Sequence, residues 1–218
     1  MIQARAVIFD MDGVIVDSEP RHERAFMDVL REIGYGDNHG FDFSRYVGLT
    51  DRELWSDFIA RHKPSHPMEA LQTMKRERVL QILRQEEPLF DGLLELIEKL
   101  VPNYRLGLAS GSEPLVVEEV LRIKSLRRFF SVVTTSSEVA RGKPAPDIFL
   151  RAAQLLGVSP QDCWVIEDSK PGVAGGLAAG MKVIAITNTH PAAELSNATM
   201  IVKNYDQIER ILLPTQAV

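Results

Sequence analysis

Hydrophobic residues in this chain follow two different spacings, and the change between them divides the sequence. Residues 6–9 form a continuous apolar run, typical of a strand that is buried on both faces of a parallel sheet. From residue 18 to residue 87 the apolar positions recur only at helical spacing, which predicts helices over residues 20–33, 53–62 and 68–85. The chain therefore begins with one strand and continues with a purely helical segment.

From residue 88 onward, strand-like and helix-like patterns alternate, as they do in βαβ units with a parallel sheet. The predicted strands cover residues 104–109, 130–134, 164–166, 182–186 and 200–202, and the predicted helices cover residues 93–100, 114–121, 147–156, 174–179 and 206–213. We expect an α/β fold in which residues 1–16 and 88–218 form a Rossmann-like parallel sheet core. Residues 17–87 would form an all-helical cap inserted after the first strand, a place suited to a lid.

Composition narrows the class of protein. A chain of 218 residues with 45% hydrophobic and 25% charged residues fits an ordinary soluble globular protein with one core and a small second module. A net charge of −5 argues against a nucleic-acid partner, and no segment reads as a leader or a membrane span. The single cysteine, Cys163, excludes an internal disulfide framework and is predicted to be packed and inert. We expect a cytoplasmic protein, a monomer or weak dimer, without membrane contacts.

Two pairs of acids follow predicted strands. Asp10 and Asp12, with Gly13 behind them, come directly after the first apolar run, and Glu167 and Asp168 follow the strand at residues 164–166. Ligand sites of open α/β sheets lie beyond the carboxyl ends of the strands. Carboxylates this close repel one another unless a cation lies between them, so the pattern predicts a hard divalent metal ion, Mg²⁺.

Two further motifs add groups that suit a phosphate. Ser110 and Gly111 lie where a strand runs into a small-residue turn, which offers a hydroxyl and backbone N–H groups to an anion. Lys143 follows in a stiff loop between Gly142 and Pro144. Taken singly, the acid pair could be a solvated turn, the serine a helix cap and the lysine a surface residue. Together they favour phosphoryl transfer, in which positioning and charge neutralisation supply most of the catalysis.

With these motifs in this order, the sequence resembles the haloacid-dehalogenase superfamily of phosphohydrolases, in its β-phosphoglucomutase-like branch with a helical cap. The resemblance spans nearly the whole chain and includes the helical cap, which lies between the Asp10–Asp12 pair and the turn at Ser110 and Gly111. It implies that Asp10 is the nucleophile that forms an aspartyl-phosphate, and that Asp12 is the general acid and base. It also implies a phosphate site at Ser110, Gly111 and Lys143, and a Mg²⁺ site at Asp10, Asp168, the backbone carbonyl of Asp12 and, near the metal, Glu167.

In the cap, His22, Thr50 and Arg52 are candidate substrate contacts, although a packing or solvated role for His22 is equally open. Trp55 and Phe58 are expected to form the cap's own core. The charged run at residues 75–78 is expected to be a solvated helix face.

Residue 51 bears on the choice between two activities. Mutases of this branch carry an arginine where this chain has Asp51, and the neighbouring Arg52 would be rotated by about 100° on a helix. A cap arginine holds the second phosphate of a bisphosphate intermediate. We therefore expect a phosphatase acting on a small phosphorylated metabolite, such as a sugar or polyol phosphate, and keep a β-phosphoglucomutase-type sugar phosphomutase as the alternative.

Overall fold

The protein is described from a computed structural model, which covers residues 5–36, 40, 42 and 51–213. These residues form two compact units. The core unit comprises Met1–Asp17 with Pro88–Val218, and the cap unit comprises Ser18–Glu87. The boundary inferred from the sequence lies one residue before the first of these junctions.

A parallel sheet forms the centre of the core unit. In the described residues its strand order is β3-β2-β1-β4-β5-β6, and every neighbouring pair is parallel. The strands are β1 (Ala6–Phe9), β2 (Arg105–Ser110), β3 (Val132–Thr135), β4 (Cys163–Glu167), β5 (Lys182–Ile186) and β6 (Met200–Val202). The side chains of β1 are completely buried because this strand lies between β2 and β4. The predicted Rossmann-like fold is confirmed.

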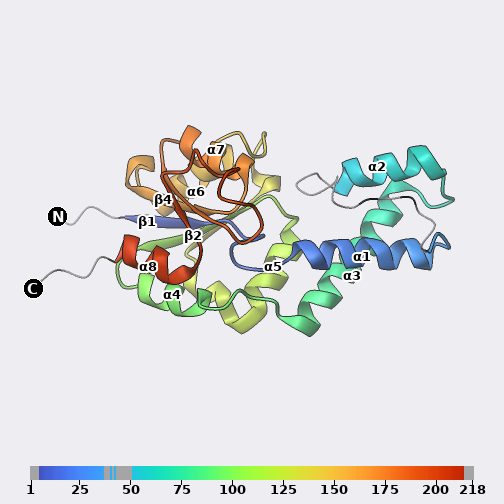
Figure 1. The fold of residues 1–218 in the computed structure, drawn as a ribbon, viewed down its shortest axis with the longest axis horizontal. Coiled ribbons are helices and arrows are strands. Elements are labelled where there is room, and N and C mark those ends of the chain that lie inside the picture. The colour runs from blue at the N-terminus through green and yellow to red at the C-terminus, as the bar shows by residue number, and fades with distance from the viewer. Residues whose placement is uncertain (1–4, 37–39, 41, 43–50, 214–218) are drawn as a thin grey trace, which may run out of the picture. The chain divides into compact units, whose positions relative to one another are not determined.

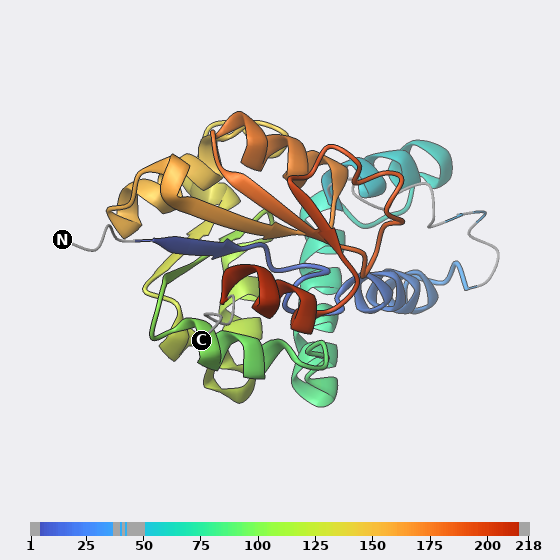
Figure 2. The same cartoon turned by 60° about the vertical axis from the view of Figure 1, so that its left-hand side comes forward.

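Helices cover both faces of this sheet. They are α4 (Leu93–Leu100), α5 (Pro114–Arg122), α6 (Asp147–Leu156), α7 (Lys170–Ala178) and α8 (Tyr205–Leu212), with short 3₁₀ helices at Ile123–Phe129, Ser136–Glu138 and Pro160–Asp162. In Figures 1 and 2, α6 and α7 lie on one side of the sheet, and α4 and α8 lie together on the other. The apolar side chains of α6 pack on β1 and β2 and form one continuous hydrophobic core with the inner residues of β4 and β5.

The start of α7 differs from the prediction. The helix begins at Lys170, four residues before the predicted range, because Ser169 caps it and accepts a hydrogen bond from the N–H of Gly172 at 3.1 Å. Pro171 is compatible with a first turn, where its missing N–H has no partner to lose. The predicted helix began only after this Pro–Gly pair. Cys163 is buried, as predicted, and burial raises its pKa to about 11.

The chain leaves the core unit after β1 and returns at nearly the same point. The N–H of Asp17 donates to the carbonyl oxygen of Pro88 at 2.9 Å, and Val16 lies opposite Leu89 in an antiparallel bridge. The two ends of the seventy-residue insertion are therefore tied to each other by backbone contacts of the core unit itself.

The cap unit consists of α1 (Glu19–Glu32), α2 (Asp51–His62) and α3 (Met68–Glu86). Trp55 and Phe58 are fully buried among apolar side chains of all three helices, as predicted, and the rings of Phe26 and Trp55 are 4.7 Å apart. The solvated face predicted at residues 75–78 is wrong for Lys75, which is 2% exposed and forms an ion pair with Asp51. None of the helices within the described ranges is long and apolar enough to cross a membrane.

Candidate active site

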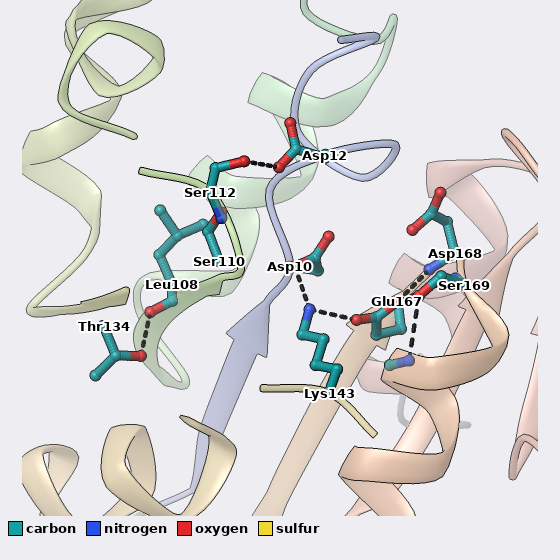
Figure 3. Close-up of polar contacts among 11 residues, drawn as sticks. Asp10, Asp12, Leu108, Ser110, Ser112, Thr134, Lys143, Glu167, Asp168 and Ser169 are labelled. Carbon is teal, nitrogen blue, oxygen red and sulfur yellow. Dashed lines mark hydrogen bonds and ion pairs between the residues drawn. The ribbon is translucent and has the colours of Figure 1, made fainter. Parts of the chain in front are cut away.

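The nucleophile predicted from the sequence lies at the end of the central strand. Asp10 continues the pairing of β1 with β4 through its N–H, which donates to the carbonyl oxygen of Ile166 at 2.9 Å. Its side chain is only 6% exposed. Lys143 donates a hydrogen bond from Nζ to Asp10 Oδ1 and another to Glu167 Oε1, the latter at 2.5 Å (Figure 3). The amine of Lys143 therefore joins the two predicted acid pairs, because it contacts Asp10 from the first pair and Glu167 from the second.

Three carboxylates meet beside this lysine. Asp10, Glu167 and Asp168 each present an oxygen, and these three oxygens lie within 4.8 Å of one another in a buried cluster. Burial raises the pKa of Asp10 well above its ordinary value, although Lys143 opposes the shift. Burial and the neighbouring Glu167 raise the pKa of Asp168 to about 7. Three carboxylates thus share one lysine, and burial favours the protonated forms of Asp10 and Asp168.

Lys143 itself remains charged. Burial disfavours the charged amine, but the carboxylates of Asp10 and Glu167 outweigh it and raise the pKa of Lys143 above its ordinary value. The aromatic ring of Phe149 lies 5.1 Å from Nζ and packs against the amine. The site therefore holds a permanent cation next to Asp10.

Glu167 is fixed by the start of α7. Its Oε2 accepts hydrogen bonds from the N–H groups of Asp168 and Ser169, both at 3.0 Å, and from Ser169 Oγ at 2.9 Å. A Cβ at Gly172 would lie 1.7 Å from Glu167 Oε1, so only glycine leaves room for this carboxylate. Glu167 is wholly buried and its two oxygens have four hydrogen-bond donors. This carboxylate is the most rigidly held of the three.

Asp168 and the turn after β1 are fitted to each other. Thr189, in the loop after β5, donates a hydrogen bond from Oγ1 to Asp168 Oδ2. Gly13 has a φ of +75°, and a Cβ there would lie 1.9 Å from Asp168 Oδ2 and 2.9 Å from Thr189 Cγ2. The glycine behind the first acid pair is therefore required both by its backbone conformation and by the close approach of Asp168.

The oxygen-only donor set fits a hard divalent cation. Asp10 and Asp168 offer carboxylate oxygens for it, and a bound cation would favour the ionised forms of these two buried acids. Glu167 belongs to the same cluster, with its carboxylate already engaged by Lys143 and α7. The residues present thus fit a metal of the Mg²⁺ type.

The predicted phosphate-binding motif of Ser110 and Gly111 lies at the end of β2. Ser110 is fully buried, and its Oγ accepts a hydrogen bond from the N–H of Ser112 at 3.0 Å, which leaves its own hydrogen for another acceptor. Gly111 lies in the exposed turn between them, and a Cβ there would meet nothing within 4 Å. Ser112 donates from Oγ to Asp12 Oδ2 at 2.6 Å (Figure 3). This hydrogen bond joins the turn after β2 to the acid pair of Asp10 and Asp12.

Several side chains near the site belong to no recognisable sequence motif. Asn188 Nδ2 donates to the carbonyl oxygen of Gly13 at 2.8 Å and to the hydroxyl of Tyr205 at 3.1 Å, and that hydroxyl donates to the carbonyl oxygen of Val14 at 2.5 Å. Sequence reasoning missed Asn188, Tyr205 and Thr189, and it took Ser112 only as part of the turn and helix start after β2, without a role in the site. They are ordinary polar residues, and only the folded sheet brings them to the turn after β1.

The candidate cap residues lie in the other unit. His22 is half-buried on α1, and Arg52 is exposed in the first turn of α2. Thr50 lies outside the described residues. A role for these three residues in substrate binding remains a prediction.

An aspartate is buried at the end of the central parallel strand, beside a lysine and an acidic cluster. This arrangement is typical of an α/β enzyme that carries out phosphoryl chemistry. The family model of the haloacid dehalogenase-like hydrolases matches residues 4–180. The chain therefore belongs to the haloacid dehalogenase-like hydrolases, as its motifs predicted.

Two of the relatives that match this chain have different activities in their names. The chain is 33% identical over 184 residues to fructose-1-phosphate phosphatase YqaB of Escherichia coli, a match that covers 83% of this chain and 95% of that protein. It is 29% identical over 217 residues to β-phosphoglucomutase of Bacillus subtilis, over 96% of this chain and 93% of that protein. Among solved structures, CbbY from Rhodobacter sphaeroides in complex with phosphate is similar with a TM-score of 0.82 and 25% identity, over 94% of this chain and 96% of that one.

Proposed function

We propose that this protein is a Mg²⁺-dependent phosphatase that hydrolyses a small phosphorylated metabolite, a sugar or polyol phosphate, through an aspartyl-phosphate on Asp10. The observation that carries the proposal is the buried Asp10 carboxylate beside Lys143 and the acids Glu167 and Asp168. The similarity to a fructose-1-phosphate phosphatase supports the substrate class. A carboxylate is a weak nucleophile, so the proposal depends on a phosphoryl group whose charge is neutralised in this place.

The reaction divides into two transfers. In the first, a carboxylate oxygen of Asp10 forms a bond to phosphorus, the bond from phosphorus to the substrate oxygen breaks, and Asp12 gives its proton to that oxygen. In the second, water attacks phosphorus, Asp12 takes a proton from the water, and the bond to Asp10 breaks to release inorganic phosphate. Asp12 therefore acts first as acid and then as base.

Other residues of the core hold the phosphoryl group during both transfers. Lys143 offsets its negative charge, and the Ser110 hydroxyl and the Gly111 N–H donate hydrogen bonds to its oxygens. The side chains of Asp10 and Asp168 and the backbone carbonyl of Asp12 would hold Mg²⁺, with Glu167 beside them. When bound, Mg²⁺ supplies further neutralisation of the phosphoryl charge and fixes its orientation.

The nucleophile is tested by Asp10→Asn, a nearly isosteric change that removes the attacking charge. We expect this variant to lose Mg²⁺-dependent release of phosphate from a panel of sugar and polyol monophosphates while its circular dichroism spectrum is unchanged. The wild-type enzyme, quenched during turnover of a labelled substrate, should carry the label on Asp10. Full turnover by Asp10→Asn, or a label found on another residue, would contradict the assignment.

A sugar phosphomutase is the second candidate, because a β-phosphoglucomutase is also similar over most of the chain. Within the cap unit, Asp51 pairs with the buried Lys75, and the pair carries no net charge when both groups are ionised. A mutase needs cationic groups in its cap for the second phosphate of a bisphosphate. The pairing of the acid at position 51 with a lysine therefore supports the phosphatase.

The two candidates differ in product. We expect steady release of inorganic phosphate, and negligible conversion of β-glucose 1-phosphate to glucose 6-phosphate when the reaction is primed with the 1,6-bisphosphate. Rapid isomerisation would overturn the choice. In that event Arg52→Ala should remove the isomerisation and spare slow phosphate release if Arg52 holds the second phosphate.

A further inference from the structure

Ser112 makes a contact that neither its motif nor its place before α5 explains. Its Oγ donates to Asp12 Oδ2 at 2.6 Å, across 100 residues of sequence. The residue that caps α5 is Glu113, and no side-chain hydrogen bond caps this helix. The hydroxyl of Ser112 is therefore directed at Asp12 and not at the first turn of the helix that follows.

The position of Ser112 is itself fixed. Its N–H donates to Ser110 Oγ at 3.0 Å, and Ser110 is the fully buried last residue of β2. A chain of hydrogen bonds thus runs from the end of β2 through Ser110 and Ser112 to the carboxylate of Asp12 (Figure 3). Because β2 pairs with β1 as far as Leu108, two residues before Ser110, both ends of this chain are anchored to neighbouring strands of the sheet.

We propose that Ser112 is a positioning residue for Asp12, an inference that rests on the proposed role of Asp12 as acid and base. The hydrogen bond to Oδ2 restrains rotation of the carboxyl group about its Cβ–Cγ bond. It thereby assigns the exchanged proton to Oδ1 in both transfers. A carboxyl group that gives a proton in one step and takes one in the next must present the same oxygen each time, and a neutral hydroxyl enforces this without adding charge to an already crowded site.

This role predicts a dependence on the leaving group. An alkyl phosphate needs a proton on its departing oxygen, whereas p-nitrophenolate departs readily without one. Since kcat/KM reports the first transfer alone, Ser112→Ala should lower kcat/KM for a sugar or glycerol phosphate by about 10- to 100-fold, a share of the usual general-acid contribution. It should lower kcat/KM for p-nitrophenyl phosphate by less than about threefold.

The experiment compares four proteins on both substrates: wild type, Ser112→Ala, Asp12→Ala and the double variant. If Ser112 acts through Asp12, its removal has no further effect on the substrate preference once Asp12 is gone. Ser131→Ala is the matched control, because it also removes one serine hydroxyl, which donates to the carbonyl oxygen of Leu106 at 3.1 Å. This control should leave the ratio of the two kcat/KM values at the wild-type level.

The outcomes separate this inference from the proposed function. An equal loss for both substrates, no loss, or an additional loss in the double variant would overturn the role of Ser112. If Asp12→Ala shows no leaving-group dependence, the acid assignment of Asp12 fails, and the proposed mechanism fails with it. A leaving-group dependence in Asp12→Ala that is absent from Ser112→Ala would reject the positioning role alone.

Discussion

At the scale of single side chains, Lys143 forms ion pairs with two buried carboxylates at once. Its Nζ donates to Asp10 and to Glu167, and its own side chain is only 14% exposed. In such a place a lysine contributes more than one in a surface ion pair, because removing it leaves two buried acids without their cationic partner. The same amine is proposed to meet the phosphoryl group, so stability and catalysis depend on one residue.

Lys143→Met is therefore expected to lower kcat/KM by about 100- to 1,000-fold, the usual effect of removing one donor from a developing charge. It should also lower the melting temperature in the absence of metal, and added Mg²⁺ should restore part of that loss. Arg141→Met is the control, since Arg141 lies in the same loop and forms an exposed ion pair with Asp147 at 2.7 Å. Similar kinetics for both variants would refute a special role for Lys143.

Asp10, Ser110 and Glu167 could be predicted because each lies where a strand ends, and Lys143 because it lies between Gly142 and Pro144 in a stiff loop. Lys75 shows how a residue can be misjudged even when the pattern is informative. It lies four residues after Leu71 and four before Val79, on the buried stripe of α3, but its charge suggested solvent. The partner that permits its burial, Asp51, lies 24 residues away on α2, and the helical pattern contains no information about that pairing.

At the scale of elements, α8 and the loop after β5 hold the turn that carries Asp12. Tyr205, the first residue of α8, is 5% exposed, and its hydroxyl bonds Val14 and Asn188. The helix predicted at residues 206–213 begins one residue earlier in the structure, at Tyr205, and the sequence pattern gave Tyr205 no role. The element boundaries were predicted to within a few residues, whereas the contacts between elements were not, because they depend on the packing of the sheet.

Tyr205→Phe keeps the ring and removes the hydroxyl. We expect a loss of about 1–3 kcal/mol in the free energy of unfolding, because buried polar groups on Val14 and Asn188 lose a partner. We also expect a lower kcat, because the turn carrying Asp12 is less firmly held. Tyr104→Phe is the matched control, since that hydroxyl also donates to a backbone carbonyl, of Leu212 at 2.8 Å, on the C-terminal end of the same helix. Urea denaturation and steady-state kinetics of both variants test this prediction. An unchanged kcat in Tyr205→Phe would contradict the proposal that the Tyr205 hydroxyl holds the turn carrying Asp12.

At the scale of the whole molecule, the acidic cluster makes the stability of the fold depend on pH and on metal binding. The raised pKa of Asp168, about 7, exceeds the value of about 4 in an unfolded chain. The folded protein without metal therefore binds more protons than the unfolded one, and loses stability as the pH rises between these two values. A metal ion competes with the same protons, so it binds best where the carboxylates are ionised.

The rise in melting temperature caused by Mg²⁺ should accordingly be larger near about pH 8 than near about pH 5.5. Thermal melts with and without saturating Mg²⁺ at both pH values measure this directly. In Asp168→Asn the dependence on pH should be weaker, because one titrating ligand is gone. An equal shift at both pH values in the wild-type protein would argue against metal binding by this cluster.

The connection between the two units has a consequence for how such proteins diversify. Since the chain departs at Asp17 and returns at Pro88 through a direct backbone hydrogen bond, the segment between them spans almost no distance on the core. A replacement of any length could be spliced into this junction without altering the register of the sheet. Evolution could therefore exchange one inserted module for another by recombination at a single junction, while the residues at the strand ends are inherited unchanged.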